Sequence, residues 1–84
     1  MSWRYQPIWR DDPTVGRSYS LCEIYLDRRG RLEQWTESAA IAANGEDLDD
    51  LIGELRHMLD DAQEWEPVEF ASLRVGMQFK RRER

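Results

Sequence analysis

One stretch of the sequence has helical periodicity, and it limits what the rest of the chain can build. Apolar residues recur there at spacings of three and four, which is typical of an amphipathic helix that packs one side against a sheet. Asp47, three residues ahead of Asp50, is a suitable N-cap for a helix over about residues 48–64, and Pro67 ends it. The predicted apolar stripe consists of Leu48, Leu51, Ile52, Leu55, Met58, Leu59 and Ala62.

Three stretches ahead of this helix alternate between apolar and polar residues, as β-strands do. The first, residues 3–9, contains Pro7, which cannot donate a hydrogen bond within a sheet, so we expect it at or near an edge. The second, residues 18–27, has the strongest strand pattern. A turn over residues 27–30 then returns the chain into a third strand over residues 31–38, so a hairpin precedes the helix.

After the helix the sequence predicts one more strand and an extension. Residues 68–71 are predicted to form a short fourth strand. Residues 73–79 alternate again and form a candidate edge strand, which would pair within the chain or with a second copy. We expect one domain over residues 1–71 and a C-terminal extension over residues 72–84 that ends in a basic tail, residues 80–84.

These elements predict an α+β fold. It is a three- to four-stranded antiparallel sheet with one amphipathic helix packed on one face, in the order β-β-β-α-β. With 84 residues the chain has the size of a single domain. It contains no apolar run of about 18 residues, and its N-terminus lacks the pattern of a signal peptide. We therefore expect a cytoplasmic protein without a membrane segment.

Charge is distributed unevenly along the chain. Residues 32–71 hold twelve acidic residues and one arginine, whereas residues 72–84 hold five basic residues and one glutamate. An acidic surface repels nucleic-acid phosphates and attracts basic proteins, so nucleic acid is disfavoured and a basic protein is a candidate partner. A solvated helix face is the simpler interpretation. The candidate acidic docking face consists of Asp49, Asp50, Glu54, Asp60, Asp61 and Glu64.

The sequence carries no catalytic or metal-binding signature. One cysteine, Cys22, and one histidine, His57, are too few for a zinc site of the usual kind, and no Asp-x-Asp-x-Asp-Gly order predicts a calcium loop. Cys22 is expected in the core, and His57 is expected as a solvated residue off the apolar stripe, nearer to Glu54 and Asp61. We therefore expect no catalytic residues, no cofactor and no metal.

Glu23 is the most informative ionisable residue, because it lies in the middle of the predicted second strand. If its face of the sheet is buried, the carboxylate needs a partner such as Arg4 or Arg31 on an adjacent strand, and this interpretation is favoured. If the face is open and concave, Glu23 becomes the centre of a candidate ligand-binding or catalytic site.

The predicted strands carry many aromatic residues for a sheet that one helix covers on one side only. They either fill the helix-facing core or form an open face that a second subunit closes, which would make the protein a homodimer. Stacking of RNA bases on such a face is disfavoured by the acidic surroundings. The candidate interaction face consists of Trp3, Tyr5, Trp9, Tyr19, Tyr25 and Trp35.

Four motifs follow one another in the chain: Tyr19-Ser-Leu-Cys-Glu-Ile-Tyr25, Asp27-Arg-Arg-Gly30, Trp35-Thr-Glu37 and Gly45-Glu-Asp-Leu-Asp-Asp-Leu51. In this order, over residues 3–70, the chain resembles a group of small uncharacterised bacterial α+β proteins, and the resemblance implies a fold but no activity. More distantly, the strand and helix order resembles the N-terminal domain of HicB-type antitoxins. That domain binds a small toxin ribonuclease and is usually followed by a DNA-binding segment, for which the 14 residues after Phe70 are too few.

Three hypotheses of function follow. The first is a self-associating protein-interaction module, which uses the aromatic residues or residues 73–79 for a second copy and the acidic helix for a partner. The second, implied by the distant resemblance, is an antitoxin-like inhibitor of a small basic toxin. The third is a small-ligand binder or enzyme centred on Glu23.

Overall fold

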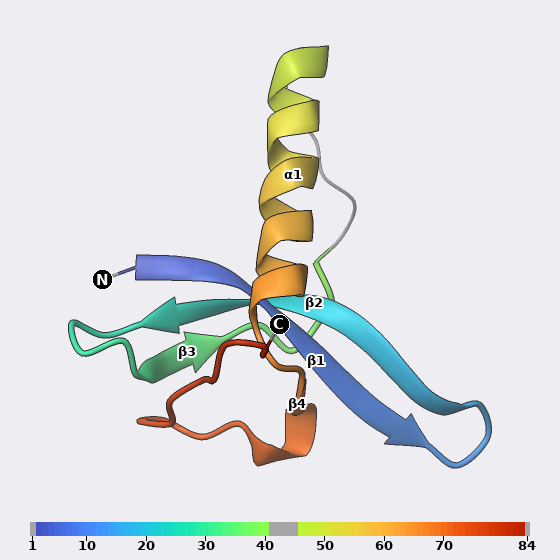
Figure 1. Ribbon diagram of the computed structural model, residues 1–84. Helices are drawn as coiled ribbons and strands as arrows, with labels where there is room; N and C mark the ends of the chain where they lie inside the picture. Colours follow the sequence, from blue (N-terminus) through green and yellow to red (C-terminus); the bar gives the residue numbers. More distant parts are fainter. Residues whose placement is uncertain (1, 41–45, 84) are drawn as a thin grey trace.

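The computed structural model describes residues 2–40 and 46–83, which form a four-stranded sheet and one long helix (Figure 1). The strands lie in the order β3-β2-β1-β4. The elements are β1 (Ser2–Asp12), β2 (Gly16–Leu26), β3 (Leu32–Trp35), α1 (Leu48–Glu64), β4 (Val68–Glu69) and a short 3-10 helix (Phe70–Ser72). The predicted α+β class, with one helix and a sheet, is confirmed.

Two tight turns connect the first three strands. Between β1 and β2, the Asp12 carboxylate accepts hydrogen bonds from the N–H groups of Thr14 and Val15 at 2.7 and 3.2 Å. Between β2 and β3, the Gly30 N–H donates to the Asp27 carbonyl at 3.0 Å, and Gly30 adopts a φ of 75°, which favours glycine. The predicted hairpin is therefore confirmed. β1 extends further than predicted at both ends, and β2 begins and ends earlier than predicted.

The sheet is mixed, whereas the sequence predicted an antiparallel one. β4 pairs with β1 in parallel, through Ile8 with Val68 and Trp9 with Glu69. Parallel strands require a crossover connection. Here the chain runs from β3 through α1 before it reaches β4. Because this pairing spans two residues, Pro7 and the described residues ahead of it lie where β1 has no strand on that side, as expected for this proline.

One face of the sheet is aliphatic, and its central residues are fully buried. Ile8, Ile24 and Leu32 are fully buried there, together with Cys22. The segment after α1 reaches the outer edge of β3, where the Leu32 N–H donates to the Met77 carbonyl at 2.8 Å. Figure 1 shows this segment on the side of the strands away from α1. We call this side of the sheet the aliphatic face.

The C-terminal extension packs on the chain's own sheet. Residues 73–79, a candidate edge strand in the sequence, contain a turn instead, in which the Met77 N–H donates to the Arg74 carbonyl at 3.2 Å and Gly76 has a φ of 89°. Further along, the side chain of Arg81 pairs with Glu64. The basic tail thus meets the acidic helix of its own chain.

The helix α1 begins and ends at the predicted residues. The Asp47 carboxylate accepts the Asp50 N–H at 2.8 Å and caps the first turn, while Trp65, after the last turn, is extended. Figure 1 shows α1 rising away from the strands, with its C-terminal end at β1. The N-terminal half of the helix therefore projects from the sheet.

Candidate functional site

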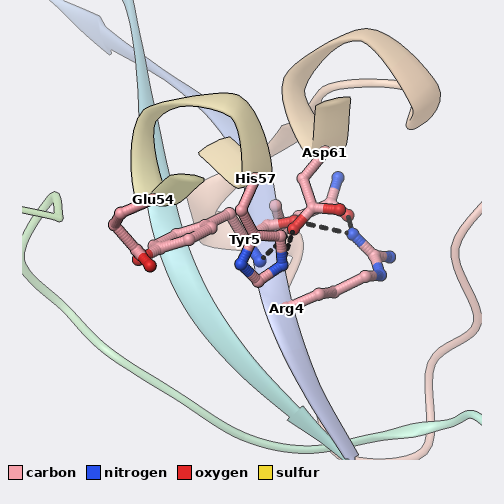
Figure 2. A network of polar contacts seen from close by, with 6 residues as sticks. Arg4, Tyr5, Glu54, His57 and Asp61 are labelled. Atoms are coloured by element: carbon pink, nitrogen blue, oxygen red, sulfur yellow. Dashed lines mark hydrogen bonds and ion pairs between the residues drawn. The ribbon is translucent and has the colours of Figure 1, made fainter. Parts of the chain in front are cut away.

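A buried carboxylate joins the polar side of α1 to β1. Asp61 is 8% exposed, accepts the Tyr5 N–H at 3.0 Å and lies 3.1 Å from Nε2 of His57, one helical turn earlier (Figure 2). Among the described strands, β4 reaches β1 only at Ile8 and Trp9, so the Tyr5 N–H has no strand partner on that side. Asp61 supplies the acceptor that a longer β4 would have provided.

Tyr5 makes the second contact between β1 and α1. Its hydroxyl donates to a carboxylate oxygen of Glu54, and its ring packs edge-on against Trp3 and His57 with centroids 5.3 and 5.2 Å away. Figure 2 shows Glu54, His57 and Asp61 extending from one side of the helix towards β1, around Tyr5. Burial, together with the hydrogen bond to Glu54, raises the pKa of the Tyr5 hydroxyl well above its ordinary value.

The contacts of this cluster attach α1 to β1. In nucleophilic catalysis a histidine held by a carboxylate also faces a side-chain nucleophile. Here the His57 ring lies against the rings of Trp3 and Tyr5, and the Tyr5 hydroxyl is already bound to Glu54. His57 is half-buried, with 40% of its side chain exposed, so it is solvated only in part.

Arg4 lies on the aliphatic face, where aromatic rings enclose it. Its guanidinium carbon stands 3.7 Å from the centroid of Trp65 and 5.1 Å from that of Phe79. One terminal nitrogen donates to the Tyr5 carbonyl at 2.9 Å and to Gln6 at 2.7 Å, and burial lowers the pKa of Arg4 to about 10. The adjoining cavity, of about 290 Å³, is lined by Arg4, Leu26, Gly30, Trp65, Gln78 and Phe79.

Five of the six residues of the predicted interaction face share the other side of the sheet, which we call the aromatic face. Cross-strand pairing places Trp3 opposite Tyr25 and Trp9 opposite Tyr19, and Tyr5 lies between these pairs. Trp3 is 45% and Tyr19 is 63% exposed, so α1 covers this face only in part.

Two predicted site residues have other surroundings than expected. Trp35 pairs with Ile24, so it belongs to the aliphatic face. Glu23 is half-buried on the aromatic face, with the Tyr25 hydroxyl 3.5 Å from its carboxylate. The expected ion pair between Glu23 and an arginine is not formed within the described residues. Among those residues the buried carboxylate is that of Asp61.

The predicted acidic docking face falls into two groups, one with partners in the chain itself and one that is exposed. Glu54 and Asp61 bind β1, and Glu64 pairs with Arg81, so these three carboxylates have partners in the chain itself. The members that remain exposed are Asp49, Asp50 and Asp60.

The centre of the apolar stripe of α1 faces solvent, although the sequence predicted that it packs on the sheet. The helix meets β1 through Glu54, His57 and Asp61, which lie on the side of α1 away from the stripe. The spacing of four, three and four residues along the exposed line was a signal in the sequence, because it is typical of paired helices. The α1 seam, as we call this line, consists of Leu48, Ile52, Leu55 and Leu59, which are 68%, 38%, 51% and 54% exposed.

Neither a metal centre nor a membrane span is found in the described ranges. Within residues 2–40 and 46–83, no three His, Cys, Asp or Glu side chains gather to hold a metal ion. No helix in those ranges is long and apolar enough to cross a bilayer. Comparison with known proteins finds no matching family model, no similar curated protein and no similar solved structure, so both resemblances noted above stay predictions.

Proposed function

We propose that this chain is a self-associating protein-interaction module. The observation that carries the proposal is the α1 seam. Of the eight large hydrophobic side chains exposed in the described part of the chain, four belong to this one line on one helix. Single exposed apolar side chains are ordinary in proteins, whereas contiguous apolar patches are typical of interfaces.

Part of the aromatic face is also exposed next to the helix. The exposed Trp3 ring lies 5.3 Å from His57 of α1, between ring centroids. Tyr19 borders a cavity of about 310 Å³ that reaches α1 at Ala62. Its lining residues are Pro7, Tyr19, Ser20, Leu21, Ala62 and Pro67. A projecting apolar helix next to an apolar hollow offers both halves of a packed interface.

The polar cluster supports this proposal over a catalytic one. Asp61, His57 and Glu54 each hold a contact that fixes α1 to β1. Their arrangement accounts for the projection of the helix, and it leaves the apolar side available. The helix is thus anchored by its polar side and presents its apolar side.

Multi-angle light scattering of the purified chain over a wide range of concentrations tests the proposal. The monomer has a mass of 10.0 kDa, and we expect the measured mass to rise towards twice that value as the concentration increases. A mass that stays at 10.0 kDa at every concentration would contradict self-association.

A further inference from the structure

The α1 seam has the spacing of a helix that pairs with another helix. Leu48, Ile52, Leu55 and Leu59 follow one another at four, three and four residues, as positions d, a, d and a of a heptad repeat do. All four are exposed, and the helix contacts its own sheet from the opposite side. The inference drawn from this seam rests on the proposed function and names the surface that performs it.

The two flanks of the seam differ in chemistry. The flank at position e is polar and consists of Asp49, Arg56 and Gln63. The flank at position g is apolar and consists of Leu51 and Met58. In a parallel pair, position e of one helix faces position g of the other, which would set Asp49 and Arg56 against apolar side chains. In an antiparallel pair each flank faces the same flank of the other helix, so polar meets polar and apolar meets apolar.

The charges beside the seam complement those of a second copy. In the antiparallel arrangement, Asp49 of one copy lies opposite Arg56 of the other, and the symmetry of the pair repeats this contact. Three other helix acids lie on the side of α1 away from the seam, where Glu54, Asp61 and Glu64 already have partners. A strongly basic partner helix would find one acid beside the seam, so the charge pattern favours a second copy of this chain.

We propose that two chains associate by antiparallel pairing of their α1 seams, with Ile52 of each copy opposite Leu55 of the other. The same register places Leu48 opposite Leu59. It also carries the projecting N-terminal half of each helix towards the C-terminal half of the other. The cavity that Ala62 lines adjoins the aromatic face. In the proposed pair, the first turn of the other copy's α1 lies next to this cavity.

Disulfide cross-linking tests the direction and register. Leu48→Cys and Leu59→Cys variants of the full chain are oxidised separately and as a mixture. In the proposed pair, the mixture yields a covalent dimer. Each variant alone does not, because its two cysteines are offset by eleven residues, about 16 Å along the helix, which exceeds the Cα separation that a disulfide spans. The wild-type chain is the control, since its single cysteine, Cys22, is buried.

Charge reversal tests the pairing of the flanks. Asp49→Arg and Arg56→Asp, made singly, each place like charges together twice in the dimer, and we expect the dimer Kd to rise by about tenfold. The double variant restores the opposite charges and returns the Kd to near the wild-type value. Asp60→Arg makes the same charge change at an exposed position outside the seam, and its Kd stays close to wild type.

The outcomes separate this inference from the proposed function. A wild-type chain that is monomeric at every concentration overturns both. A dimer whose Kd is unchanged by either single charge reversal, or in which each cysteine variant cross-links with itself, overturns the antiparallel seam and leaves self-association intact. Circular dichroism of each variant verifies the fold, which these exposed positions are expected to preserve.

Discussion

The two faces of the sheet reach different degrees of closure within one chain. On the aliphatic face, Ile8, Ile24 and Leu32 are fully buried beneath the segment that follows α1. On the aromatic face, Trp3 and Tyr19 remain substantially exposed, and α1 meets that face through its polar side. The chain therefore closes one core by itself and leaves the apolar side of α1 and part of a sheet face exposed. This exposure is the observation that supports the proposed interaction module.

The largest expected effect on stability comes from truncating a buried side chain on the aliphatic face. Ile24→Ala removes a fully buried side chain and is expected to lower the free energy of unfolding by ~2–5 kcal/mol. Leu55→Ala, at an exposed position of the seam, is expected to change the stability of the monomer by no more than about 0.5 kcal/mol. Urea denaturation at low protein concentration measures the free energy of unfolding of both variants. Equal losses would show that the two regions do not differ in closure.

A smaller effect is expected where α1 is attached. Asp61→Ala leaves the buried Tyr5 N–H without its acceptor and removes the partner of His57, so the loss should be ~1–3 kcal/mol. Asp60→Ala, at the exposed neighbouring position, is the matched control and should be nearly neutral. Thermal unfolding followed by circular dichroism measures both. The attachment role would be wrong if Asp61→Ala were as mild as its neighbour.

The Tyr5 hydroxyl should contribute less, and in a pH-dependent way. Tyr5→Phe removes the hydrogen bond to Glu54 and is expected to cost ~0.5–1.5 kcal/mol. The pKa of Tyr5 is raised above 10.0 in the folded chain, so its stabilising contribution is fully present below that pH and declines as the pH rises further. The stability gap between wild type and Tyr5→Phe should therefore narrow in alkaline urea titrations. Tyr19→Phe, at an exposed ring, is the control, and a gap independent of pH would contradict the shift.

Local signals were enough to predict much of the fold. The cap at Asp47 and the stripe after it predicted α1 with its bounds, because capping and periodicity act within a few residues. The Asp27 to Gly30 turn was predictable for the same reason. The parallel pairing of β4 was not, since its direction depends on the whole crossover between distant strands.

The site residues were harder to predict, because their surroundings are set by register and by distant contacts. Trp35 lies on the aliphatic face because β3 pairs with β2 through a register irregularity at Tyr25 and Leu26, and a shift of one residue exchanges the two faces. The side on which α1 meets the sheet is determined by Asp61 and the Tyr5 N–H, which are 56 residues apart in sequence. Periodicity located the apolar stripe but carried no information on this contact.

The most direct test of the central claim compares one seam position with an equally apolar position elsewhere. Leu55→Lys and Val15→Lys both replace an exposed aliphatic side chain, the first in the seam and the second in the turn between β1 and β2. Light scattering at one concentration where the wild type is dimeric should give a dimer for Val15→Lys and a 10.0 kDa monomer for Leu55→Lys. A Leu55→Lys chain that remains a dimer would contradict the claim that two copies meet at the α1 seam.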